Sequence, residues 1–172
     1  DDRSKELKQN ITGEENIMKK KEAQLILDEK AILGEGPAWD EKNQKLFWVD
    51  IQGKKVHIYD PQKDENKTIK INKSAGAVVP RAKGGAVLAL EDGFAFLDLN
   101  GEENVKEVET VKLETKIKVE ADNPDTRFND GKCDPAGRFW AGTMSTTESE
   151  AIGSLYCLDT DLSVRKMEEN IT

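Results

Sequence analysis

Short apolar runs broken by turn residues follow one another from Ala31 onward. Segments 45–50 and 55–59 predict two strands of a hairpin, and the second alternates polar and apolar residues with a period of two. Pro61 closes the hairpin, because proline cannot continue a hydrogen-bonded ladder. A further alternating strand is predicted at 68–71. Since no long amphipathic helix is predicted beyond the N-terminal segment, the pattern indicates an all-β protein.

The same order of elements recurs twice more along the chain. Its strands are predicted at 85–90 and 94–98, and then at 138–142 and 153–158, with an insertion around 115–126. An antiparallel unit repeated every ~40–50 residues is typical of β-propeller blades. A β-sandwich is also built from short strands and regular turns. The internal repeat favours the propeller.

Only about three such units fit between Ala31 and Thr172, whereas propellers typically close with about 4–8 blades. An open arc of three would leave apolar faces between blades exposed. We therefore expect residues 30–172 to form the N-terminal half of a propeller, covering blades 1–3. Residues 1–29 are expected to form an extension, either a tail or a first outer strand. The complementary half is then removed, disordered or present as a separate polypeptide.

Composition narrows the classes of partner. The chain has 172 residues, 35% of them charged, with a net charge of −8 and a pI near 4.9. Without a basic stripe, this balance argues against a nucleic-acid partner. No apolar run reaches the ~18 residues that suggest a membrane span. The start of the chain shows no apolar secretory segment, so we expect a cytoplasmic protein in which residues 1–17, before Met18, are an added or upstream extension.

Two short segments carry residues suited to chemistry. In the first, Glu35 stands between glycines and before Pro37, where the chain would enter an innermost strand and direct a carboxylate into a central channel. In the second, Arg127 and Asn129 are separated by one residue, so on a strand both side chains face the same way. An amide beside a guanidinium suits hydroxyls and a carbonyl, including a developing oxyanion.

Each segment also has a plainer interpretation. Glu35 could be an exposed loop glutamate, as most glutamates are. Asn129-Asp130-Gly131 could be a turn beside an unrelated arginine, and 134–137 is expected to be a turn. Asp130 is open to either role, at a turn or at the site. The single histidine, His57, is expected to be a half-exposed strand residue rather than a base or ligand.

Segments 33–39, 127–132 and 134–144 together resemble the regucalcin (senescence marker protein)/gluconolactonase family of six-bladed β-propellers. The resemblance covers about Ile32 to Leu158. It implies a metal-dependent hydrolase of sugar-type lactones, with a small lactone as substrate. By the same resemblance Glu35 is a metal ligand, Arg127 and Asn129 line the substrate cavity, and Asn129 is a second candidate ligand.

The resemblance implies one divalent cation, calcium, zinc, manganese or magnesium, held by carboxylate and amide oxygens. The other ligands and the probable general base would lie beyond Thr172, so no catalytic residue is expected within this chain and little activity is expected from it alone. Where some members have a substrate-contacting glutamate, this chain has Thr147, with Glu148 next to it as a weaker candidate. The alternatives are a non-enzymatic calcium-binding regulatory propeller and an inactive half that reassembles with a partner chain.

Overall fold

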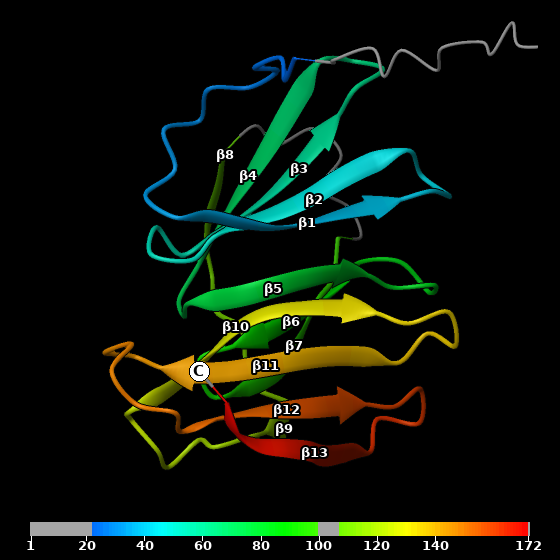
Figure 1. Ribbon diagram of the computed structural model, residues 1–172. Helices are drawn as coiled ribbons and strands as arrows, with labels where there is room; N and C mark the ends of the chain where they lie inside the picture. The colour runs from blue at the N-terminus through cyan, green and yellow to red at the C-terminus, as the bar shows by residue number, and fades with distance from the viewer. Residues whose placement is uncertain (1–21, 100–106, 172) are drawn as a thin grey trace, which may run out of the picture. The chain divides into compact units, whose positions relative to one another are not determined.

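The computed structural model describes residues 22–99 and 107–171 (Figure 1). The chain divides into two compact units, Asp1–Lys30 and Ala31–Thr172, one residue beyond the predicted end of the extension. In the first unit, residues 22–30 carry neither helix nor strand. The predictions for residues 1–17 and Met18 lie outside the described residues.

The described part of the second unit consists of strands and connecting turns, and it contains no helix. The all-β expectation is therefore confirmed. Sheet 1 contains β1 (Gly34–Asp40), β2 (Lys45–Asp50), β3 (Lys55–Asp60), β4 (Glu65–Ile71) and β8 (Glu107–Val111). Sheet 2 contains β5 (Ala75–Pro80), β6 (Ala86–Leu90), β7 (Gly93–Leu97) and β9 (Ile117–Lys118). Sheet 3 contains β10 (Thr126–Cys133), β11 (Phe139–Ser145), β12 (Gly153–Leu158) and β13 (Val164–Ile171).

Each sheet is an antiparallel meander that begins with its first strand in sequence. The predicted insertion around 115–126 contains β9, which pairs with β7 and completes sheet 2. In sheet 1 the last strand departs from the antiparallel pattern, because β8 joins the outer edge parallel to β4. Three repeated sheets therefore stand where three repeated units were predicted, and the six-bladed ring stays a prediction.

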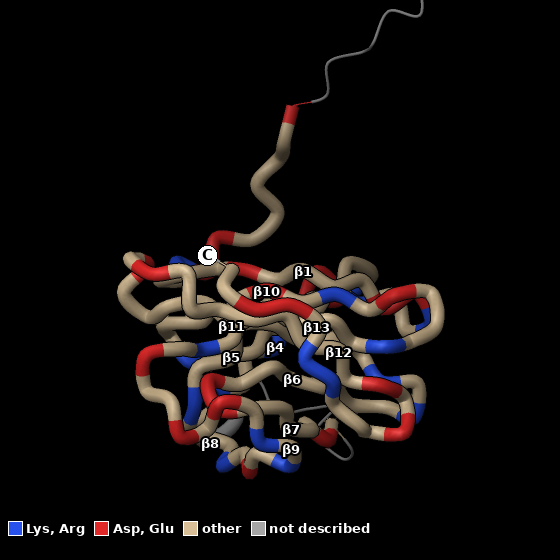
Figure 2. Tube along the Cα trace, turned by 60° about the horizontal axis from the view of Figure 1, so that its bottom comes forward, with Lys and Arg blue, Asp and Glu red and all other residues tan. Residues whose placement is uncertain are grey.

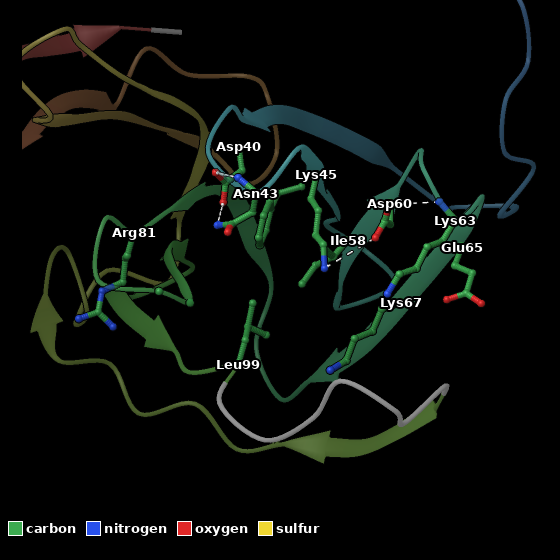
Figure 3. Close-up of a pocket in the computed structure, with 13 residues that line it drawn as sticks. Asp40, Asn43, Lys45, Ile58, Asp60, Lys63, Glu65, Lys67, Arg81 and Leu99 are labelled. Carbon is green, nitrogen blue, oxygen red and sulfur yellow. Dashed lines mark hydrogen bonds and ion pairs between the residues drawn. The ribbon is translucent and has the colours of Figure 1, made fainter.

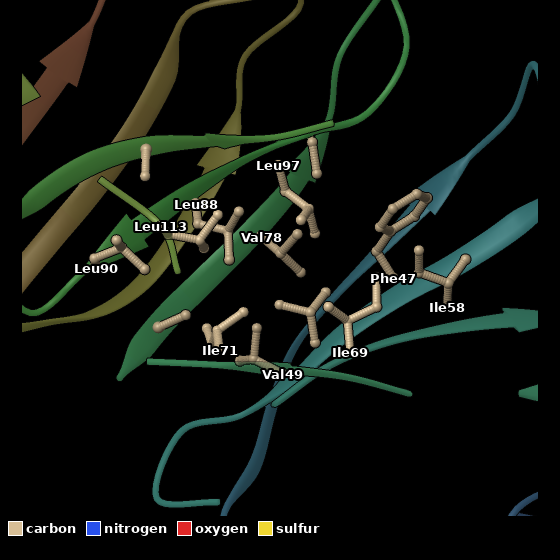
Figure 4. Packing of buried hydrophobic residues seen from close by; sticks show 14 of the residues in the cluster. Phe47, Val49, Ile58, Ile69, Ile71, Val78, Leu88, Leu90, Leu97 and Leu113 are labelled. Carbon is tan, nitrogen blue, oxygen red and sulfur yellow. The ribbon is translucent and has the colours of Figure 1, made fainter. Parts of the chain in front are cut away.

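Two hydrophobic cores separate the three sheets. Sheet 2 is buried on both faces, and its strands are correspondingly almost continuous runs of apolar residues. In sheet 3, β11 alternates between residues buried toward sheet 2 and residues that stay half-buried. The core between sheets 1 and 2 includes Phe47, Val49, Ile58, Ile69, Ile71, Val78, Leu88, Leu90, Leu97 and Leu113 (Figure 4). The core between sheets 2 and 3 is built around Phe94, Phe128, Phe139, Tyr156 and Leu158.

The prediction that His57 is half-exposed is wrong, because its side chain is only 1% exposed. Its ring stacks on Trp48 with a centroid distance of 3.8 Å and an interplanar angle of 10°. Its Nδ1 atom lies 3.1 Å from both the Asn66 Nδ2 and the Thr68 Oγ1 atoms. The stacking and the polar neighbours on β4 allow an imidazole to be buried within sheet 1.

The first strands of the three sheets, β1, β5 and β10, lie side by side and run in the same direction (Figure 1). Each of them contains a β-bulge, where the register to the next strand shifts: Glu35/Ala38, Ala75/Ala77 and Phe128/Gly131. A β-bulge places an extra residue opposite its partner strand and bends the chain locally.

The bulges touch through backbone atoms at Gly76, the extra residue of β5. A Cβ atom on Gly76 would overlap the carbonyl oxygens of Phe128 and Asn129 on β10. On its other side, a Cβ atom on Gly36 would lie 3.5 Å from the Gly76 carbonyl oxygen. Because Gly36 has a φ angle of +61°, a side chain there would also be strained. Glycine at position 76 therefore permits the close approach of the three inner strands.

We expect Gly76→Ala to lower the free energy of unfolding by about 1–3 kcal/mol, because the new methyl group forces β10 away from β5. Urea unfolding followed by tryptophan fluorescence measures this change. Gly142→Ala is the matched control, since Gly142 lies in β11 and its Cβ atom would have no heavy atom within 4 Å. Equal stability of the two variants would contradict this account of Gly76.

Candidate functional site

Glu35 lies at the second position of β1, pairs with Val49 of β2, and is exposed. The bulge follows at once, so that Gly36 and Pro37 have no partner in the β1–β2 register. Glu35 thus stands at the start of an inner strand, as predicted, whereas the central channel into which it was expected to point stays a prediction. The role of Glu35 as a metal ligand stays a prediction.

Asp50, at the end of β2, fixes the chain that leads into Glu35. Its side chain is 1% exposed and accepts hydrogen bonds from the backbone N–H groups of Ile32 (3.1 Å), Leu33 (3.0 Å) and Gly53 (2.9 Å). The Ile51 N–H also donates to the Leu33 carbonyl at 2.9 Å. Asp50 therefore joins two segments of sheet 1 at the edge where Glu35 lies. Asp50 was not among the predicted site residues, and its position at a strand end before a glycine turn is the only signal in the sequence.

Burial alone would raise the pKa of Asp50, but its surroundings reverse this effect. Hydrogen bonds from the backbone of Leu33, Gly53 and Ile32, and the charge of Lys55, lower the pKa below its ordinary value of 3.8. The ionised form is therefore the one that the folded chain stabilises.

Arg127 and Asn129 lie one residue apart on β10, are both half-buried, and interact directly. The Arg127 Nη1 atom donates to Asn129 Oδ1 at 3.2 Å and to the Phe128 carbonyl oxygen at 3.1 Å. The two side chains thus meet, as a spacing of two residues on a strand requires. The arrangement places a guanidinium and an amide at one position, where both can donate to a ligand oxygen.

The interpretation of residues 129–131 as a turn is wrong. Asn129 and Asp130 form the bulge of β10, and Gly131 resumes pairing opposite Ala141. Asp130 is exposed, and its Oδ1 atom accepts the Gly131 backbone N–H at 2.7 Å. Asparagine, aspartate and glycine favour turns, but in β10 they form a bulge. Turns and bulges both need backbone conformations outside the regular strand.

The neighbouring turn at 134–137 is as predicted. The Asp134 backbone N–H donates to the Arg138 carbonyl and the Gly137 N–H to the Asp134 carbonyl, both at 2.9 Å. The Trp140 indole N–H, with the Arg138 backbone and guanidinium, lowers the pKa of Asp134 to about 2. This carboxylate therefore has a structural role, and it anchors the tip between β10 and β11.

The bulges bring the two predicted segments to one edge of the inner strands. Gly36, next to Glu35, contacts Gly76, and Gly76 contacts the backbone of Phe128 and Asn129. A direct link also joins β10 to β1, because the Lys132 Nζ atom donates to the Pro37 carbonyl oxygen at 2.8 Å. Glu148 lies beyond β11, at the same end of sheet 3 as Arg127, since Ser145 pairs with Thr126.

Glu35 and Asn129 provide a carboxylate and an amide oxygen, both suitable for a hard divalent cation. Among residues 22–99 and 107–171, however, no group of three or more histidine, cysteine, aspartate or glutamate side chains could hold a metal ion. Two oxygen donors are too few for a calcium site, which takes about 6–8. These residues alone therefore do not form a complete metal centre.

A cleft of about 370 Å³ lies elsewhere, at the end of β1 opposite Glu35 (Figure 3). Its lining mixes charges, and Lys45 and Asp60 within it form an ion pair at 3.9 Å. The cleft is lined by Asp40, Asn43, Lys45, Phe47, Ile58, Asp60, Lys63, Glu65, Lys67, Arg81, Gly84, Gly85 and Leu99. It includes neither Glu35 nor the Arg127–Asn129 pair.

Charges of both signs are interspersed along the described chain (Figure 2). Within the described residues, no helix has the length and apolar character needed to cross a membrane.

Comparison with known families gives one match over most of the chain. The family described as the SMP-30/Gluconolactonase/LRE-like region matches residues 33–172. Regucalcin of Danio rerio is 41% identical over 143 residues, which cover 82% of this chain and 45% of the relative. The 6-deoxy-6-sulfogluconolactonase of Pseudomonas putida is 31% identical over 150 residues, covering 85% of this chain and 47% of the relative.

Among solved structures, a calcium-binding protein, regucalcin, from Agrobacterium tumefaciens aligns with a TM-score of 0.69 and 25% identity. The alignment covers 81% of this chain and 44% of that structure. The chain thus spans about half the length of the relatives that it matches.

We expect Asp50→Asn to lower the free energy of unfolding at pH 7 by about 1–3 kcal/mol, because three part-buried backbone N–H donors lose their charged acceptor. A lowered pKa in the folded state means that the carboxylate stabilises the fold above pH ~4 and loses this effect as the pH falls through the lowered pKa. The difference between the wild type and Asp50→Asn should therefore shrink below pH 4. Urea unfolding at pH 7 and pH 3 measures it.

Asp122→Asn, at an exposed aspartate, is the control and should change stability little at either pH. A difference between wild type and Asp50→Asn that stays constant from pH 7 to pH 3 would contradict the assignment to the carboxylate.

Proposed function

Because the chain belongs to the SMP-30/gluconolactonase/LRE-like family, we propose that it is the first half of a hydrolase of sugar-type lactones. The observation that supports this most is the hydrogen-bonded Arg127–Asn129 pair on β10. Gly76 of β5 lies between the backbone of this pair and Gly36, the residue after the exposed Glu35. A lactone presents a carbonyl oxygen and several hydroxyls to such a surface. Donors aimed at the carbonyl stabilise the negative charge that develops when water adds to it.

In this proposal each residue has a separate role. Arg127 donates to a lactone oxygen, and its hydrogen bond to Asn129 orients the amide. Glu35 and Asn129 contribute oxygen atoms to a divalent cation, which is calcium, zinc, manganese or magnesium. When bound, the cation would polarise the lactone carbonyl. The remaining ligands and the general base come from a complementary C-terminal half, consistent with relatives about twice as long.

A regulatory calcium-binding propeller is the second candidate. It is favoured by the relative described as a calcium-binding protein. The structure of that relative aligns with 81% of this chain. Both candidates use Glu35 as an oxygen donor, but only the hydrolase needs Arg127 to face a reacting carbonyl. The expected cytoplasmic location stays a prediction.

The test is a chimera in which residues 33–171 replace the corresponding half of the Pseudomonas putida lactonase. We expect it to hydrolyse D-glucono-1,5-lactone, measured as acid release in a pH-stat, and to lose activity in EDTA. Glu35→Gln should lower kcat/KM at least ~100-fold, since even residues outside a metal's ligands cost about 10–100-fold. Arg127→Met should lower kcat by about 10²–10³-fold, as the loss of an oxyanion donor does.

Glu65→Gln, at an exposed glutamate on β4 at the opposite end of sheet 1, is the control and should leave kcat/KM unchanged. Hydrolysis that survives both EDTA and Glu35→Gln would overturn the proposal. A chimera that binds calcium but does not hydrolyse the lactone would favour the regulatory candidate.

A further inference from the structure

Lys132 bridges the first and last of the three inner strands. It lies on β10, three residues after Asn129, and pairs with Trp140 of β11. Lys132 is exposed, and its Nζ atom donates a hydrogen bond to the Pro37 carbonyl oxygen of β1 at 2.8 Å. Lys132 and Pro37 are separated by 95 residues in the chain.

The acceptor is available because of the β1 bulge. Gly36 and Pro37 both stand opposite the single residue Trp48, so Pro37 has no partner in the register with β2. Its carbonyl oxygen can therefore accept a hydrogen bond from another sheet. Lys132 fills this position with a charged donor, which forms a stronger hydrogen bond than a neutral donor does.

Two constraints of opposite sense then act on the three inner strands. The backbone contacts of Gly76 with Phe128 and Asn129, and with Gly36, limit how closely β10 and β1 can approach β5 between them. The hydrogen bond from Lys132 to Pro37 limits how far β10 and β1 can separate. The β1 bulge directly follows Glu35, and the β10 bulge contains Asn129.

From this geometry we infer that Lys132 is a positioning residue, which holds the Glu35 and Asn129 segments at a fixed separation across sheet 2. Its role in catalysis rests on the proposed function, whereas its role in holding the two strands does not. Catalytic geometry tolerates little displacement, because a misplacement of about 1 Å can cost about 10²-fold in rate. A residue that does not touch the substrate can therefore control the rate.

Amide hydrogen exchange of the 172-residue chain tests the structural part without any activity. Lys132→Met removes the donor but keeps the apolar stem, and Lys132→Arg keeps a donor. We expect exchange in peptides covering 34–40 and 127–133 to be at least ~3-fold faster in Lys132→Met, since local opening governs exchange. Lys132→Arg should behave as the wild type, and the urea midpoint should not change.

Lys116→Met is the matched control. The exposed Lys116 lies on the connection between β8 and β9 and forms an ion pair with Glu114 of the same connection, away from the inner strands. Its exchange in the same two peptides should equal that of the wild type. Unchanged exchange in Lys132→Met would overturn the inference, and so would a fall in its urea midpoint with faster exchange throughout the chain.

The same substitutions in the chimera test the catalytic part. We expect kcat/KM for D-glucono-1,5-lactone to fall about tenfold in Lys132→Met and to recover in Lys132→Arg. Faster local exchange with unchanged kcat/KM would overturn the positioning role. An unsubstituted chimera without activity would overturn the proposed function, and the exchange measurement would still decide whether Lys132 holds the strands.

Discussion

The arrangement of the candidate site depends on a backbone contact in which no side chain takes part. Gly76 lies against the carbonyl oxygens of Phe128 and Asn129, and Gly36 lies against Gly76. Any side chain at position 76 would push β10 away from β5, and the segments that carry Glu35 and Asn129 would separate with them. Interiors are packed as densely as organic crystals, so such a displacement cannot be absorbed locally. One residue without a side chain therefore sets the spacing of three sheets.

The polar residues of the candidate site lie in a bulge or within two residues of one: Asn129 is in the β10 bulge, and Glu35 and Arg127 are paired just before the β1 and β10 bulges. A regular strand buried on both faces has no place for an arginine or an asparagine, and the strands of sheet 2 are accordingly apolar almost throughout. In β10 the bulge interrupts the regular pairing, and there Asn129 is half-buried beside an exposed Asp130. Apolar cores on either side keep the inner strands in place, which lets the bulges differ in sequence without loss of the fold.

Local patterns were sufficient for much of the fold. Period-two alternation predicted the hairpin of β2 and β3, and the repeated order of strand and turn predicted three sheets. The parallel addition of β8 to β4 was not predicted, because that pairing joins segments about forty residues apart and leaves no local signal. His57 was misjudged for the same reason: its burial depends on Trp48 of β2 and on Asn66 and Thr68 of β4, the two strands on either side of its own.

In the candidate site, too, the residues with local signals could be predicted and those with long-range contacts could not. Glu35, Arg127 and Asn129 could be identified from short segments, since the residue types and the spacing of two on a strand are local facts. The groups that hold them in place are long-range: Asp50 fixes the chain before Glu35 from 17 residues away, and Lys132 reaches Pro37 across 95. A lysine and a buried aspartate have no distinctive sequence pattern, because their function depends on which carbonyl or N–H the fold brings to them. In this chain, therefore, the residues suited to contact a ligand can be found from the sequence, whereas the residues that position them become visible only in the folded structure.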